Sequence, residues 1–123
     1  MSRGQYPATR MRRNRMKAFS RRMLAEHRLS VEDLIWPLFV IEGEDKVEPV
    51  ASMPGVSRHS IDRLVTQARE AEALGIPAIA VFPSIDPALK DNEGTLAGDG
   101  DNLVCRAVRA VKKACPELGV ICD

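Results

Sequence analysis

The stretch Leu34-Ile-Trp-Pro-Leu-Phe-Val-Ile41 decides the fold, because it is a continuous apolar run that ends shortly before a glycine, Gly43. A strand of a parallel sheet is covered on both faces, so it reads as an unbroken apolar run and not as an alternation. Pro37 argues against a strand, since proline removes one hydrogen-bond donor from a sheet. We nevertheless interpret residues 34–41 as a buried strand.

Two more apolar runs, over residues 78–83 and 118–123, predict further short strands. Between the first two runs, residues 42–59 form a polar excursion with a turn at 52–56, where Pro54 and Gly55 stand together. The segment that follows this excursion and the segment that precedes the third run both read as helices. The predicted order is therefore strand, helix, strand, helix, strand.

Both helices are predicted from apolar residues at a spacing of 3.6. Ser60 can cap the first helix, and Gly75 can adopt the left-handed conformation that ends it. Asn102 can cap the second helix, and Pro116 closes it. The apolar positions are Ile61, Leu64, Val65, Ala68 and Ala71 in the first helix, and Leu103, Val104, Ala107, Val108, Val111 and Cys115 in the second.

Strands that alternate with helices indicate an α/β fold with a parallel sheet. All three strands are apolar throughout, so both faces of the sheet need cover, and two helices cannot cover both faces well. The last strand would also leave a hydrophobic edge, which natural folds avoid. We therefore expect the natural protein to continue beyond Asp123.

Charge divides the chain into a basic arm and an acidic body. Residues 1–28 hold nine Lys or Arg and one acid, a net charge of +8, whereas residues 29–123 hold nine bases and sixteen acids, a net charge of −7. Such an arm suits an acidic surface, either another subunit or a nucleic acid. Residues 1–25 are also Arg-rich and acid-poor, as a mitochondrial transit peptide would be, but the helical pattern runs on without a cleavage-like break.

The cysteines indicate a reducing compartment. There are three, Cys105, Cys115 and Cys122, and no pair has the spacing of a metal site or of a redox motif. We expect all three to serve in packing. No apolar run is long enough to span a membrane, which takes about 18 residues.

Function in parallel sheets gathers at the carboxyl ends of the strands. Three places qualify here: Glu42-Gly43, residues 83–86, and Asp123. Asp123 is the strongest candidate, because a carboxylate directly after an apolar strand could orient an amine or imine, or hold a metal. The alternative is an ordinary solvated aspartate at the end of a strand.

Seven stretches in this order resemble one enzyme family. They are Arg10-Met-Arg-Arg-Asn-Arg15, Leu34-Ile-Trp-Pro-Leu-Phe-Val40, Ser52-Met-Pro-Gly-Val56, Ser60-Ile-Asp62, Leu74-Gly-Ile-Pro-Ala78, Phe82-Pro83, and Pro116-Glu-Leu-Gly-Val120 followed by Asp123. Together they are similar to the N-terminal third of the δ-aminolevulinic acid dehydratase (porphobilinogen synthase) family. The loop over residues 97–102 departs from the family pattern.

The resemblance implies a fold, an activity and a division of the chain. Residues 34–123 would form the first three β/α units of a TIM (β/α)₈ barrel, with three strands and two crossover helices. Residues 1–33 would form an N-terminal arm between subunits, an extended segment followed by a short helix. The family is a hydro-lyase that condenses two δ-aminolevulinate molecules to porphobilinogen by Schiff-base chemistry, early in the biosynthesis of tetrapyrroles such as heme and chlorophyll. Its two catalytic lysines would lie beyond residue 123, so this piece alone would be inactive.

The resemblance also assigns roles to residues and implies partners. Asp123 would be catalytic and would bind substrate, and Arg10, Arg12, Arg13 and Arg15 would belong to the allosteric arm at the subunit interface of a cytoplasmic homo-octamer. Magnesium is the expected cofactor, with an allosteric role and the active site as a second candidate place for it, and zinc is the alternative. We expect no metal ligand within this chain, and no nucleic-acid or membrane partner. The rival interpretation is a small module that uses its basic arm for nucleic-acid binding or protein interaction, without catalysis.

Overall fold

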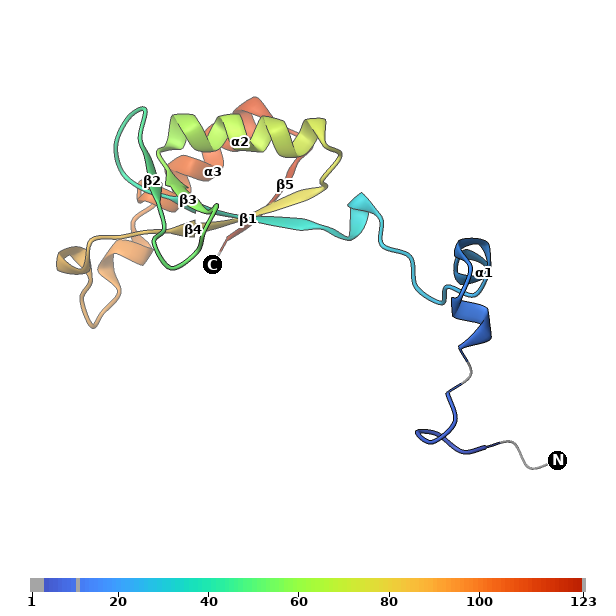
Figure 1. The fold of residues 1–123 in the computed structure, drawn as a ribbon. Coiled ribbons are helices and arrows are strands. Elements are labelled where there is room, and N and C mark those ends of the chain that lie inside the picture. The colour runs from blue at the N-terminus through green and yellow to red at the C-terminus, as the bar shows by residue number, and fades with distance from the viewer. Residues whose placement is uncertain (1–3, 11, 123) are drawn as a thin grey trace.

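The computed structural model describes residues 4–10 and 12–122 and shows one α/β body with an arm that extends away from it (Figure 1). The body holds five strands: β1 (Ile35–Val40), β2 (Val47–Pro49), β3 (Ser57–His59), β4 (Ala78–Pro83) and β5 (Gly119–Cys122). The helices are α1 (Ala18–Met23) in the arm, and α2 (Ile61–Ala73) and α3 (Leu103–Ala114) in the body. Short 3₁₀ turns lie at Arg13–Arg15, Val31–Asp33, Pro87–Leu89 and Thr95–Gly98.

The three long apolar runs form a parallel sheet, as the sequence predicts. β1 pairs with β4 from Ile35 opposite Ala78 to Val40 opposite Pro83, and β4 pairs with β5. Pro37 lies inside β1, opposite Ala80, and does not prevent the strand from pairing along its length. The full strand order is β2-β3-β1-β4-β5.

The polar excursion between β1 and α2 is more regular than the sequence indicates. It contains β2 and β3, which pair with each other in antiparallel fashion, and β3 pairs in parallel with the carboxyl end of β1. β3 is Ser-Arg-His and β2 is Val-Glu-Pro, and each is only three residues long, so neither carries an apolar pattern that a sequence could reveal. Their pairing with the free edge of β1 is what makes them strands.

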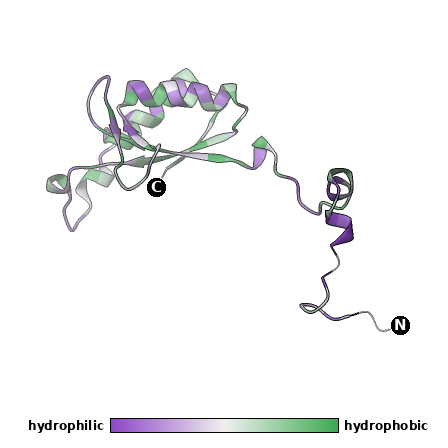
Figure 2. Cartoon of the chain, viewed as in Figure 1, coloured by the Kyte–Doolittle hydropathy of each residue, from purple (hydrophilic) through white to green (hydrophobic). Residues whose placement is uncertain are grey.

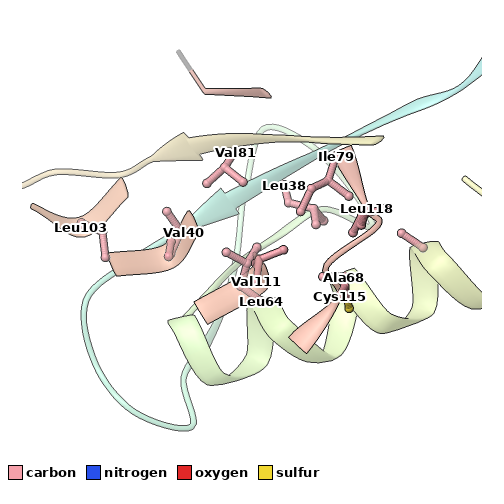
Figure 3. Close-up of a cluster of buried hydrophobic side chains, with 12 residues drawn as sticks. Leu38, Val40, Leu64, Ala68, Ile79, Val81, Leu103, Val111, Cys115 and Leu118 are labelled. Carbon is pink, nitrogen blue, oxygen red and sulfur yellow. The ribbon is translucent and has the colours of Figure 1, made fainter. Parts of the chain in front are cut away.

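Both body helices lie on one face of the sheet, where they form the core (Figures 1 and 3). Helix α2 buries Leu64, Ala68 and Ala71, and α3 buries Leu103, Ala107 and Val111, as their spacing predicts. Alternate residues of the strands meet these helices. They are Leu38 and Val40 of β1 and Ile79 and Val81 of β4. Figure 2 shows hydrophobic and hydrophilic bands along α2, as expected for a helix with one buried side.

The other face of the sheet is also apolar, yet nothing in the described residues covers it fully. Phe39 and Phe82 contact each other there, with their ring centroids 5.9 Å apart. Ile35 at one end and Ile121 at the other are about half exposed, at 54% and 46%. This arrangement agrees with the expectation that two helices cannot cover both faces of these strands.

The predicted helix ends are confirmed at two positions and wrong in detail at a third. Gly75 ends α2 with a φ of 78°, which is the left-handed conformation. The side chain of Asn102 caps α3 by accepting a hydrogen bond of 2.9 Å from the backbone N–H of Cys105. Ser60 stands at the cap position of α2, but its side chain does not bond to the helix.

Ser60 instead joins the start of α2 to the loop after β1. Its fully buried hydroxyl accepts a hydrogen bond of 2.9 Å from the N–H of Lys46 and donates one of 3.3 Å to the carbonyl of the same residue. The N–H of Ser60 also donates to that carbonyl, at 3.0 Å. One side chain thus satisfies the backbone groups of a residue fourteen positions away.

Replacing Ser60 with alanine should lower the free energy of unfolding by about 1–3 kcal/mol, because the backbone N–H of Lys46 would lose its partner in a partly buried place. Urea unfolding measures the loss. The matched control is Ser52→Ala, since Ser52 is exposed in the turn before β3 and should change the stability little. Equal effects of the two substitutions would contradict the role of the Ser60 hydroxyl.

Candidate active site

The parallel strands bring their carboxyl ends to one edge of the sheet, and this edge carries the candidate site. β1 and β4 end in register, and the N–H of Ser84 donates a hydrogen bond of 2.8 Å to the carbonyl of Val40. β5 ends beside them, with Cys122 opposite Val81. The places predicted after β1 and β4 therefore lie next to each other, although 41 positions separate Glu42 from Pro83 in the sequence.

A hollow of about 410 Å³ lies at this edge, between the loops that follow β1 and β4 and the first turn of α3. Its polar lining is rich in carboxylates, and Lys46 and Arg106 are the cations. The acidic residues that line it are Glu42, Glu48, Asp86, Asp99 and Asp101. Part of its wall is apolar and is formed by Ile41, Leu96 and Leu103. A hollow of this kind suits a polar ligand more than an apolar one.

Ion pairs set the electrostatics of the hollow. The Lys46 ammonium lies 2.7 Å from the carboxylate of Glu48, and its hydrogen bond and charge lower the pKa of Glu48 below the ordinary value. Arg106 pairs with Glu42, and the hydrogen bond that the guanidinium donates to this carboxylate raises the pKa of Arg106. The two cations offset part of the charge of the acidic lining.

The loop after β4, residues 84–101, is the longest connection in the body, and α3 holds its end. Arg109 donates to the carbonyl of Gly100 at 2.9 Å and pairs with the carboxylate of Asp101 at 2.6 Å. The side-chain amide of Asn102 donates to the carbonyl of Leu96 at 3.2 Å. Earlier in the loop, Asp86 accepts a hydrogen bond of 2.9 Å from the N–H of Ala88 and so begins a 3₁₀ turn.

The structure brings together only some of the residues that the sequence singles out. Glu42 and Asp86 line the hollow, as expected from their positions after β1 and β4. Asp123, the predicted catalytic residue, lies outside the described residues. Arg106 also lines the hollow, but the sequence did not predict it. In the sequence it is one of several cations on the polar side of a predicted helix.

The prediction that all cysteines serve in packing is wrong for Cys122. Cys115 is buried at the end of α3, where burial raises the pKa of its thiol, and Cys105 is half-buried. Cys122 is exposed, although it lies in a strand. The reason is geometric: Cys122 is the last residue of β5, which forms the edge of the sheet, and the described residues leave it uncovered.

The arm presents its arginines to solvent. Arg10, Arg12, Arg13 and Arg15 are all exposed, and the guanidinium of Arg10 lies over the ring of Tyr6, 5.6 Å from its centroid. Arg10, Arg12 and Arg15 line a shallow surface hollow together with Tyr6 and Thr9. Helix α1 also exposes its large apolar side chains: Phe19, Met23 and the following Leu24 are 57–79% exposed. The arm thus offers both charge and apolar surface to a partner.

Within residues 4–10 and 12–122, no three His, Cys, Asp or Glu side chains are grouped so that they could hold a metal ion. Among the same residues, no helix is long and apolar enough to cross a membrane.

Comparison with known proteins gives one consistent result. The family model described as delta-aminolevulinic acid dehydratase matches residues 8–123. The delta-aminolevulinic acid dehydratase of Bradyrhizobium diazoefficiens is 55% identical over 116 residues, which is 94% of this chain and 33% of that protein. The enzyme of a Synechocystis species is 45% identical over 118 residues, 96% of this chain and 36% of its own length.

A solved structure agrees with these sequences. The crystal structure of the Toxoplasma gondii delta-aminolevulinic acid dehydratase, determined with its reaction product porphobilinogen, superposes with a TM-score of 0.85 at 36% identity. The match covers 94% of this chain and 32% of the Toxoplasma chain. The chain therefore spans about one third of the length of the relatives that it matches.

Proposed function

Because this chain belongs to the delta-aminolevulinic acid dehydratase family, we propose that it forms the N-terminal third of an enzyme that condenses two δ-aminolevulinate molecules to porphobilinogen. The observation that carries the proposal is the close match of nearly the whole chain to a family member solved with porphobilinogen. β1, β4 and β5 would be the first three barrel strands. The Schiff-base lysines would come from later strands, so residues 1–123 alone would have no activity.

Asp123 is the residue of this chain that we propose to act on substrate. It directly follows Cys122, the last residue of β5, and so stands in sequence at the carboxyl end of a parallel strand. The condensation joins two amino ketones and releases two molecules of water, and each Schiff base carries a positive charge when protonated. A carboxylate at this position would hold the substrate amine or the protonated imine by a charge-assisted hydrogen bond.

A metal would take its ligands from outside the described residues. Members of this family use magnesium or zinc, but the described residues contain no suitable group of three ligands. The arm hollow is lined by arginines, which repel a cation. As the family resemblance implies, we propose that an active-site metal and the allosteric magnesium take their ligands from other parts of the complete enzyme, and no step of the chemistry here depends on them.

The arm would bind a neighbouring subunit. Its exposed arginines and the exposed apolar residues of α1 suit the acidic body of a second copy, which carries the opposite charge. The complete enzyme would be a homo-octamer in the cytoplasm. Family membership favours this role for the arm over nucleic-acid binding, because the arginine cluster lies within the part of the chain that the family model matches.

A full-length graft tests the proposed function. In this graft the chain replaces the matching third of the Bradyrhizobium diazoefficiens dehydratase, whose remaining two thirds supply the rest of the barrel. We expect the graft to form porphobilinogen from δ-aminolevulinate and to elute with the mass of eight chains. The colour reaction of porphobilinogen measures the first result, and light scattering measures the second.

The control replaces the same third with a shuffled arrangement of this chain's residues, which should give no product. A graft that folds into the native assembly but forms no porphobilinogen would contradict the proposed function. Salt-dependent binding of the graft to DNA or RNA would favour the rival role of the arm.

A further inference from the structure

The Arg106 side chain contacts two loops that are far apart in the sequence. It lies in the first turn of α3, and its guanidinium pairs with the carboxylate of Glu42, directly beyond the end of β1. The Nε of the same guanidinium donates a hydrogen bond of 3.0 Å to the carbonyl of Asp101, the end of the loop that follows β4. One side chain therefore bridges the loops of two neighbouring strands at the carboxyl edge.

The chemistry of arginine suits this bridge. Its planar group presents several donors in a fixed geometry and stays charged at every physiological pH, whereas a lysine would supply one mobile point charge. The side chain is only 37% exposed, and Glu42 contributes most to raising its pKa. The neighbouring Arg109 holds Gly100 and Asp101 but does not reach Glu42, so it anchors the loop without joining it to β1.

We propose that Arg106 is a positioning residue, which fixes the loop over residues 84–101 against the end of β1 and thereby shapes the mouth where substrate enters. The inference rests on the proposed function. The loop has eighteen residues and two short 3₁₀ turns but no strand or α-helix of its own, so its position depends on such anchors. Without Arg106, its last residues would keep their bonds to Arg109 but lose their connection to β1.

Lys90 makes the position of the loop measurable. It is exposed, and it is the only lysine in residues 84–101, so a protease that cuts solely after lysine reports the opening of this loop at one bond. Replacing an arginine adds or removes no cleavage site for such a protease. Mass spectrometry of the fragments identifies the cut after Lys90 and gives its rate.

In the full-length graft, Arg106→Gln should raise the rate of cleavage after Lys90 about tenfold, because two charge-assisted hydrogen bonds are lost. The kcat/KM for δ-aminolevulinate should fall about tenfold, chiefly through a higher KM, as expected when an entrance loses its shape but the reacting groups stay in place. Glu42→Ala should reproduce both changes. The temperature of unfolding should shift by no more than about 3 °C, since exposed ion pairs stabilise weakly.

The double exchange Glu42→Arg with Arg106→Glu restores the ion pair with its charges reversed, but a carboxylate at position 106 cannot donate to the carbonyl of Asp101, so it should recover only part of both losses. Lys113→Gln, which removes an exposed cation farther along α3, is the matched control and should leave cleavage and kinetics unchanged. Unchanged cleavage and KM in Arg106→Gln would overturn the proposal. So would a fall in kcat and unfolding temperature alone, which a purely structural role predicts. An inactive parent graft would refute the proposed function, while the cleavage rates would still decide whether Arg106 holds the loop.

Discussion

Asp123→Ala in the full-length graft is expected to lower kcat/KM for δ-aminolevulinate by about a hundredfold or more, while the enzyme assembles normally. Truncating one partner of a desolvated, hydrogen-bonded charge pair costs about 2–5 kcal/mol, which corresponds to a factor of roughly thirty to several thousand. The charge at issue is the substrate amine or protonated imine, which would be left without a counterion in the barrel mouth. Steady-state kinetics and light scattering measure the two expectations.

Two further variants separate the charge of Asp123 from its size. Asp123→Asn keeps the shape and a hydrogen-bonding oxygen but removes the negative charge, so it should lose almost as much activity as alanine. Glu117→Ala removes an exposed carboxylate just before β5 and should leave turnover near normal. Near-normal turnover of Asp123→Ala would refute the catalytic role and leave the solvated strand-end aspartate as the better interpretation.

Leu64→Ala should lower the free energy of unfolding by about 2–5 kcal/mol, the usual loss when a fully buried leucine is truncated. Leu64 has no exposed surface and belongs to the cluster between α2, α3 and the sheet (Figure 3). The substitution removes apolar burial and leaves a cavity, because helices held to a sheet cannot collapse fully into the space. Urea unfolding of the graft measures the change.

Leu74→Ala is the matched control, since Leu74 follows the same helix but is 59% exposed. It should cost less than about 1 kcal/mol. Similar losses for the two leucines would mean that the apolar face of α2 is not the main contact between this helix and the sheet.

The sequence determined the elements whose signals are local. The apolar run from Leu34 to Ile41, the helical spacing of Leu64, Ala68 and Ala71, and the stop at Gly75 each depend on residues close in the chain, and the structure has all of them. The ordered set of short motifs also carried the family assignment, because together they are far more specific than any one alone.

The sequence did not determine contacts between distant residues. β2 and β3 become strands only through pairing with each other and with the edge of β1, and neither has a pattern of its own. Cys122 lies in an apolar strand, yet it is exposed. Its burial depends on whether another element packs over the end of β5, which the sequence of the strand does not determine.

The candidate site divides along the same line. The positions of Glu42, Asp86 and Asp123 after apolar strands follow from the sequence, since parallel strands must end at one edge. The pairing of Arg106 with Glu42 does not follow from it, because 64 positions separate the two residues and both read as ordinary surface charges. Only the tertiary structure brings them together. The register of the strands and the packing of α3 against the sheet determine the positions of the two side chains, and no single stretch of the chain encodes either the register or the packing.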